Sequence, residues 1–228
     1  MTNLIEFVTT ATMGNAIEFG DMTITTRYSA TAGSSPTRGV VGGGGYPNRT
    51  NVIDYNQIMT QGNSIQFGDL NTAMSQAGGC GNEIRAMIMG GSTASDNSNE
   101  IQYTTIGTKC NFVDFGNLSS GRQTVAAVST SVQATATAGA TDGDTVQNII
   151  EFVNIMTTGN AIDLGDLQTQ RRANGAFGSP VRGVVVAGCT PTIFGNIEFF
   201  NPQSKGNATN WGEMDRRRSL YALSLIHI

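Results

Sequence analysis

The side chains that usually carry catalysis or bind metals are sparse in this sequence. His227 is the only histidine in 228 residues, and Cys80, Cys110 and Cys189 are odd in number and widely spaced. Nucleophilic triads need a histidine beside the nucleophile, and soft or imidazole-preferring metals need clustered Cys or His ligands. Neither a disulfide framework nor a zinc knuckle is indicated. We predict free cysteines, no metal, no cofactor and no enzymatic activity.

The only histidine lies in a segment that we expect to be non-native. Leu223–Ile228 resembles the translation of an adapter used to prepare sequencing libraries, and non-native segments are excluded from fold reasoning. The alternative is a short apolar terminal strand. Without this segment, no histidine remains for a nucleophilic triad or a copper site.

Acidic residues are the remaining candidates for catalysis, because a pair of carboxylates suffices for a glycosidase. Asp21, Asp69 and Asp166, however, recur at the same place in successive repeats, which favours a structural role at a turn. Thr141–Asp144 lacks the further oxygen ligands of a calcium loop, and Gly42–Gly45 lacks the Lys-Ser/Thr of a phosphate loop. We expect a Gly-Asp turn and a strand exit there.

Composition narrows the classes of partner. The 13 Lys and Arg residues against 17 Asp and Glu give a formal net charge of −4, so a nucleic-acid-binding surface is not indicated. No apolar stretch approaches the ~20 residues that span a bilayer, and the N-terminus lacks the pattern of a secretory signal. The 29 glycines and the 13% share of charged residues are typical of short strands joined by many turns.

A repeat of about 48 residues organises the chain. Its first anchor is an isoleucine before an acidic or amide residue and an aromatic one, at Ile5, Ile53, Ile101, Ile150 and Ile197, with spacings of 48, 48, 49 and 47 residues. Its second anchor follows 14 residues later, at Phe19, Phe67, Phe115, Leu164 and Trp211. Such constancy predicts a rigid hairpin.

The hairpin has a turn containing Asn, usually Gly-Asn, as at Gly62-Asn63 and Gly159-Asn160, and both residue types accept the positive φ of tight turns. Alternation in its second strand predicts that one face points inward. The inward residues would include Ile17, Ile65, Val113 and Ile162. Met59, Met87, Met89 and Met156 fall on the expected strands, where we predict that they fill the core.

A second pair of strands completes each repeat. Runs such as Thr37–Gly43 and Val181–Gly188, with Arg-Gly near the start and small residues at the end, suit an inner strand near a central axis. The third copy lacks these features. Four strands in 48 residues without a helical period predict an all-β fold, a β-propeller with four-stranded blades.

Residues 3–222 resemble the kelch-like repeat proteins of tailed phages, of the structural or tail-fibre type. Thr37–Gly44, Asn51–Leu70, Ile150–Leu167 and Arg171-Arg172 carry the resemblance. Trp211 alone occupies the place of the characteristic kelch Trp. The resemblance implies blades at residues 22–69, 70–117, 118–166 and 167–213, two outer strands of a partial blade at 4–21, the start of the next blade at 214–222 and an incomplete ring.

Loops after the Gly-rich strands vary in length and sequence while the hairpins do not, which is typical of binding loops on a rigid scaffold; neutral drift is the alternative. The loops are Gly42–Thr50, Gly90–Asn99, Gly139–Thr145 and Ala187–Phe194. Because every blade repeats one path, we expect them on one face. The candidate binding residues are Tyr46, Asn48, Arg49, Asp96, Asn97, Asp142, Asp144, Thr192 and Phe194.

The resemblance implies a non-enzymatic virion protein of a phage tail, without a secretion signal, that contacts a host-surface glycan or protein or other virion proteins. It implies neither nucleic-acid binding nor membrane insertion, and self-association is a further expectation. Two alternatives stay open at this point: a lectin-like or carbohydrate-active propeller, and an intracellular kelch protein-interaction module.

Overall fold

The computed structural model describes residues 3–24, 31–45 and 48–219. Within these ranges the chain forms strands and one short 3-10 helix at Asp142–Asp144, without any α-helix. None of these residues belongs to a helix long and apolar enough to cross a membrane. The expected all-β fold class is confirmed.

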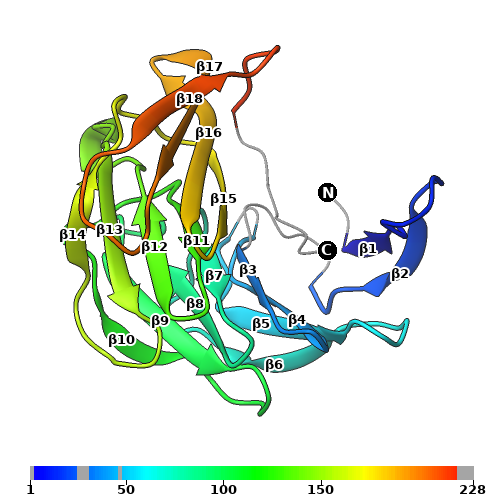
Figure 1. The fold of residues 1–228 in the computed structure, drawn as a ribbon. Coiled ribbons are helices and arrows are strands. Elements are labelled where there is room, and N and C mark those ends of the chain that lie inside the picture. The colour runs from blue at the N-terminus through cyan, green and yellow to red at the C-terminus, as the bar shows by residue number, and fades with distance from the viewer. Residues whose placement is uncertain (1–2, 25–30, 46–47, 220–228) are drawn as a thin grey trace.

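In the described residues, one two-stranded and four four-stranded antiparallel sheets form, and strands pair with their neighbours in sequence (Figure 1). The two-stranded sheet contains β1 (Leu4–Phe7) and β2 (Ile17–Asp21). The next two contain β3 (Thr31–Ser34), β4 (Arg38–Gly42), β5 (Val52–Gln57) and β6 (Ile65–Asp69), then β7 (Gly78–Gly81), β8 (Arg85–Met89), β9 (Glu100–Thr105) and β10 (Val113–Asn117). The last two contain β11 (Ala126–Ser129), β12 (Gln133–Thr137), β13 (Ile149–Asn154) and β14 (Ile162–Asp166), then β15 (Gly175–Ser179), β16 (Arg182–Thr190), β17 (Thr192–Phe200) and β18 (Thr209–Glu213).

Each four-stranded sheet lies within one expected repeat unit. The third unit, which lacks the Arg-Gly and Gly-Gly features, still forms the complete sheet β11–β14. The two strands expected within residues 4–21 are β1 and β2. The strand expected at 214–222 does not begin within residues 214–219, and residues 220–222 lie outside the described part of the chain, as does the segment Leu223–Ile228.

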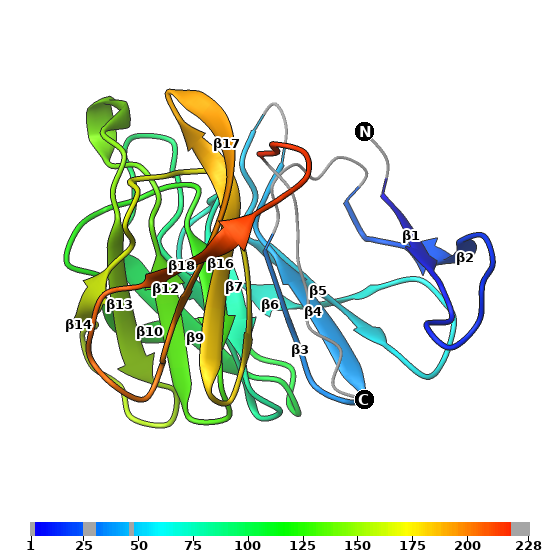
Figure 2. The ribbon, with the colours of Figure 1, turned by 45° about the horizontal axis from the view of Figure 1, so that its top comes forward.

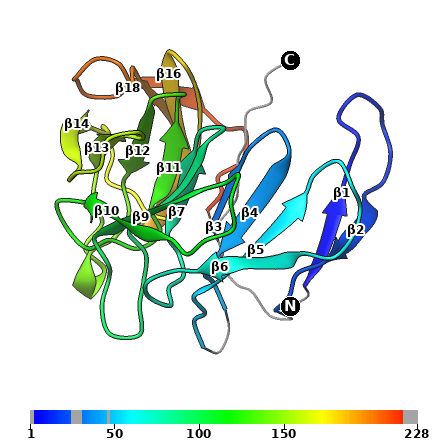
Figure 3. The same ribbon diagram turned by 90° about the horizontal axis from the view of Figure 1, so that it is seen from below.

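The first strand of each four-stranded sheet is the innermost. β3 contacts β7, β7 contacts β11, and β11 contacts β15, and Figures 1 and 3 show these strands around a common centre. Our expectation that the Arg-Gly runs form the innermost strands is wrong, because they form second strands such as β4 and β16. Small residues let the first strands approach: a Cβ on Gly78 of β7 would lie 3.0 Å from the Cβ of Ala127 of β11.

The hydrophobic core receives one isoleucine from the third strand of most sheets and one aromatic residue or leucine from the fourth. The buried residues of this kind are Ile53, Ile101, Ile150, Phe67, Phe115 and Leu164. Tyr55 and Phe67 meet edge to face, with ring centroids 5.7 Å apart, the geometry that aromatic pairs prefer. Both repeat anchors are therefore core positions.

Ile65, which we expected to face the core, is 53% exposed, and Ile17, Val113 and Ile162 are exposed as well. A β-bulge explains the difference, because the register shifts between Gln66 and Gly68. The bulge leaves Phe67 unpaired in the ladder, and Phe67 is the residue that is buried. The prediction for methionines holds for Met87 and Met89, which are buried, but not for the exposed Met59 and Met156.

The Asn-containing turn of each hairpin docks on the outermost strand of the preceding sheet, a contact that we call the Gly-Asn latch. In the first latch, Gly62 N–H donates to the Phe19 carbonyl at 2.9 Å and Ser64 N–H to the Asp21 carbonyl at 2.7 Å. The side-chain oxygens of Asn63, Asn111, Asn160 and Asn207 accept from the N–H groups of Asp21, Asp69, Asn117 and Asp166, each at 3.0 Å.

The latches revise two expectations. Gly62 has φ +150°, whereas Asn63 is not among the residues with positive φ, so the asparagine serves through its side chain. The recurring aspartates are structural, as expected, but Asp69 and Asp166 contribute through backbone N–H groups.

A glycine on the docked strand makes each latch possible. A Cβ on Gly116 would lie 2.3 Å from the carbonyl oxygen of Gly159, well inside van der Waals contact. The corresponding Cβ distances at Gly20, Gly68 and Gly165 are 2.3, 2.4 and 2.4 Å. Close backbone approach therefore explains the glycine that follows the second anchor of the repeat.

Buried polar residues one position after the first anchor tie each sheet to the chain that follows the preceding sheet. Glu151 Oε1 accepts from Ser119 N–H at 3.0 Å, and Glu151 is also paired with the buried Arg122. Asp54, Gln102 and Glu198 accept in the same way from Thr23, Asn71 and Gln168, at 3.1, 2.9 and 2.7 Å. Burial lowers the pKa of Arg122, and the negative charge of Glu151 partly offsets this decrease. The guanidinium stays charged at neutral pH.

Candidate functional site

The four predicted loop segments lie at one end of the sheets, as predicted, but the fourth is not a loop, because residues 187–190 belong to β16 and residues 192–194 to β17. They connect β4 to β5, β8 to β9, β12 to β13 and β16 to β17, and the corresponding connections lie at the upper end in Figure 2. We call this end the loop face. Tyr46 lies outside the described residues, and Asn48 and Arg49 are exposed.

Neighbouring loops on this face are bonded to one another. Arg49 Nη2 donates to Ser92 Oγ at 2.8 Å, which joins the first loop to the second. Asn97 N–H donates to Asp142 Oδ1 at 3.1 Å, which joins the second to the third. Asp144 forms an ion pair with Arg172, on the connection between β14 and β15. The loop face is therefore a connected rim, and four of the predicted site residues help to hold it together.

Asp142 and Asp144 belong to a Gly-Asp turn rather than a metal loop. Gly143 has φ +72° within the 3-10 turn, and each carboxylate bonds to a protein group. Among the described residues, no group of three or more His, Cys, Asp and Glu is arranged to hold a metal ion. The expected turn at Thr141–Asp144 is confirmed.

Three of the predicted residues have exposed side chains that form no hydrogen bond to other described residues: Asn48, Asp96 and Thr192. Asp96 caps its own loop through the backbone, since its N–H donates to Thr93 Oγ1 at 3.1 Å. Thr192 lies in the tight connection where β16 runs directly into β17, paired with Thr190. These side chains are the ones available to an outside partner.

Phe194, one of the candidate binding residues, does not present an open aromatic surface. It is half-buried, and the guanidinium of Arg171 lies 5.0 Å from the centre of its ring. Arg171 is itself buried and paired with Glu198. Phe194 therefore packs over an internal ion pair.

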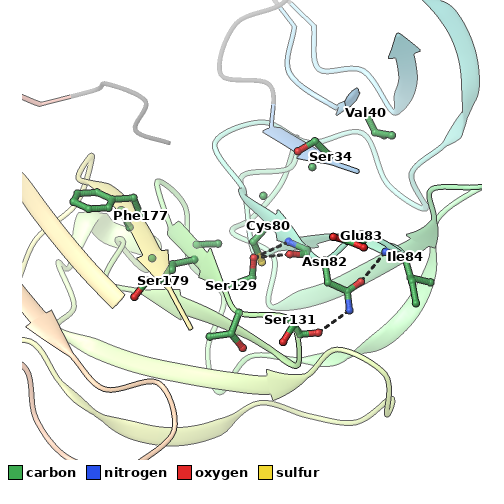
Figure 4. Close-up of a pocket in the computed structure, with 18 of the residues that line it drawn as sticks. Ser34, Val40, Cys80, Asn82, Glu83, Ile84, Ser129, Ser131, Phe177 and Ser179 are labelled. Carbon is green, nitrogen blue, oxygen red and sulfur yellow. Dashed lines mark hydrogen bonds between the residues drawn. The ribbon is translucent and has the colours of Figure 1, made fainter. Parts of the chain in front are cut away.

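A hollow that was not predicted lies at the opposite end of the sheets. It has a volume of about 860 Å³ and is lined by the four innermost strands and their following turns (Figure 4). We call it the central cavity. Equivalent positions of the four first strands contribute Gly33, Cys80, Val128 and Phe177, which increase in size along the chain. The cavity is therefore bordered by an aromatic ring at β15 and by a glycine without a side chain at β3.

Hydroxyl groups surround this cavity. Thr130 Oγ1 accepts from Gln133 N–H at 3.0 Å and Ser179 Oγ from Arg182 N–H at 3.2 Å. A hydroxyl oxygen that accepts in this way keeps its own proton available for another acceptor. Glu83 is the only charged residue in the lining, and neither Lys nor Arg is among the residues of this wall.

The cysteine of the cavity is not a nucleophile near neutral pH. Burial raises the pKa of the Cys80 thiol to about 12, so the thiolate that nucleophilic attack requires is not populated. Cys110 is exposed and Cys189 half-buried, and all three described cysteines are unpaired, as predicted.

The signal for the central cavity is present in the sequence but hard to recognise. Gly33, Cys80, Val128 and Phe177 stand two residues before the turn residues Ser35, Asn82, Thr130 and Ser179. Without the knowledge that first strands are innermost, their convergence on one hollow does not follow.

No protein family matches this chain, and no curated protein matches it either.

Proposed function

We propose that this chain is a non-enzymatic β-propeller scaffold with kelch-like blades, a component of a phage virion that binds a host surface or another virion protein through its loop face. The observation that carries the proposal is the contrast between constant latches and four dissimilar loops gathered on one rim. Binding residues concentrate on such loops over a rigid framework. Many copies on one virion would combine weak contacts into firm attachment.

The test compares two surfaces of the same protein. The loop-face variant carries Asn48→Ala, Asp96→Ala and Thr192→Ala, which change exposed side chains with no hydrogen bond of their own to other described residues. The matched control carries Glu83→Ala and Ser131→Ala at the central cavity. Fluorescently labelled proteins are mixed with a panel of bacterial strains and bound cells are counted by flow cytometry.

Loop-face recognition predicts that only the loop-face variant loses binding, with both variants retaining the wild-type melting temperature. Unchanged binding by the loop-face variant would contradict the proposal. Loss in the control alone would move the site to the central cavity.

A lectin-like function at the central cavity is the second candidate. It is favoured by the hydroxyl donors around the cavity and by Phe177, whose ring offers an apolar face beside them. Pockets that combine apolar walls with a few placed polar groups suit small ligands. Because Glu83 is the only charge in the lining, neutral sugars are expected rather than anionic ones.

Calorimetric titration with maltotriose, chitotriose and sialyllactose tests this candidate. Binding of a neutral sugar that Phe177→Ala abolishes would support it. Absence of binding by both neutral sugars at millimolar concentration, or preference for the sialylated one, would reject it.

A further inference from the structure

The outer edge of the sheet β15–β18 carries the surface that every latch in the described residues uses, yet no latch covers it. At the four described boundaries, an asparagine side chain bonds to an N–H group of the preceding outermost strand. The equivalent group on β18 is the N–H of Glu213, and neither it nor the Trp211 carbonyl forms such a bond within the described residues. A Cβ on Gly212 would meet no atom within 4 Å.

A second contact is half formed at the same edge. Arg38 and Arg85 stack over Tyr55 and Tyr103 and donate to backbone carbonyls of a neighbouring sheet at 2.7–2.9 Å. Arg182 is the equivalent residue of the last sheet. It lies over Phe199 and Trp211, 5.1 and 5.5 Å from the ring centres, but it donates to no carbonyl of the described chain. Its stacking matches that of Arg38 and Arg85, and only the carbonyl acceptor is lacking within the described residues.

Exposure of the anchor residue points the same way. Trp211 is 53% exposed, whereas Phe67, Phe115 and Leu164 at the equivalent place are 3% exposed beneath their latches. The edge therefore combines exposed aromatic surface, a strand whose outer side carries no latch in the described part of the chain and a stacked cation. Unpaired strand edges are templates for further pairing, and this edge has three internal precedents for four-stranded partners.

We propose that the outer edge of β15–β18 is a docking surface for another four-stranded sheet of this same repeat type. The partner supplies an Asn-containing turn for Glu213, a free carbonyl pair for Arg182 and a cover for Trp211. The inference is independent of what the loop face binds.

A complete sheet fits this edge better than the β1–β2 hairpin of a second copy. Boundaries between four-stranded sheets also join the first strands, as β11 joins β15. The described N-terminal unit has only β1 and β2, which pair with each other, so it offers no first strand to β15. A two-stranded unit would leave the inner half of this edge uncovered.

Trp211 makes the docking measurable, because it is the only tryptophan in the chain and lies at the proposed contact. The probe is a synthetic peptide of residues 52–69, the outer two strands of a unit, which tests the outer half of the edge alone. It has no tryptophan and carries Asp54, the Ile58 carbonyl and the Gly62-Asn63 turn. The full chain is titrated with this peptide, and the Trp211 emission is followed with excitation at 295 nm.

We expect a saturable change in emission, with affinity about tenfold weaker for a peptide carrying Asn63→Ala, because one hydrogen bond to the edge is lost. The protein variant Arg182→Leu should also bind more weakly, while its circular dichroism spectrum stays unchanged.

Two results would overturn the proposal. One is no change in emission up to the solubility limit of the peptide, or equal affinity for both peptides. The other is self-association of the full chain, measured by light scattering, that Asn15→Ala abolishes. That result would assign the edge to the β1–β2 hairpin of a second copy.

Discussion

The Gly-Asn latches and the loop face are built by the same repeat, but the latches are constant from unit to unit and the loops vary. The four latches use the same atoms at the same 3.0 Å distance. The four loops differ in length and in their side-chain contacts, since one bonds through Arg49, another through Asn97 and a third through Asp144. Backbone contacts that exclude even a Cβ permit no variation, whereas loops that bond through side chains can differ from blade to blade.

The largest effect is expected where a side chain would enter a latch. Gly116→Val places a Cβ 2.3 Å from the carbonyl oxygen of Gly159, at a residue with φ +147°. We expect a loss of more than about 3 kcal/mol in the free energy of unfolding, or failure to fold. Urea denaturation followed by circular dichroism measures it. Gly107→Ala, where a Cβ meets nothing within 4 Å, is the control, and equal stability of both variants would show that the latch is loose.

A loss of similar size is expected from the buried ion pair. Glu151→Gln leaves the charge of Arg122 uncompensated in the core and should cost about 3–5 kcal/mol. The second unit shows how the loss can be recovered, because Met74 and Gln102 stand where Arg122 and Glu151 stand in the third. The double variant with Arg122→Met and Glu151→Gln should therefore regain most of the stability in the same denaturation experiment. A double variant no more stable than Glu151→Gln alone would contradict this account of the pair.

Removing a single latch side chain should have a modest effect. Asn160→Ala deletes the bond to Asn117 N–H but keeps the backbone bonds of the turn, so a loss of about 1 kcal/mol in unfolding free energy is expected. Asn15 is the matched control, because its amide has no partner among the described residues. If Asn15→Ala and Asn160→Ala shift the melting temperature equally, the asparagine is not part of the latch.

The smallest effect is expected at Ile65. With its side chain 53% exposed, Ile65→Asp should change the unfolding free energy by less than about 1 kcal/mol. Phe67→Ala, two residues along the same strand and buried, should cost about 3–5 kcal/mol. Urea denaturation of the pair tests the bulge directly. Unfolding by Ile65→Asp would restore the original expectation that this residue faces the core.

Sequence reasoning reached the repeat, the strand count per unit and the end of the sheets at which the loops gather. These features follow from the repeat, because its two anchors, Ile53 and Phe67 in one unit, lie 14 residues apart in every unit. It did not reach the exposure of Ile65, because a bulge breaks the alternation without altering composition. It also missed the central cavity, because the convergence of Gly33 and Phe177 depends on how sheets pack. Features that follow from residue spacing were predictable, whereas a local bulge and the packing of one sheet on another were not.

The most direct test of the contrast between latches and loops is hydrogen exchange measured at single amides in the unmodified protein. The N–H groups of Gly62, Gly159 and Gly206, which donate across latches, should exchange almost as slowly as core strand amides, because only disruption of the sheet boundary exposes them. Amides at the exposed loop positions Asn48 and Ser95 should exchange much faster. Latch amides that exchange as fast as these loop amides would show that the latches do not hold the sheets together, and the account of a rigid frame carrying variable loops would be wrong.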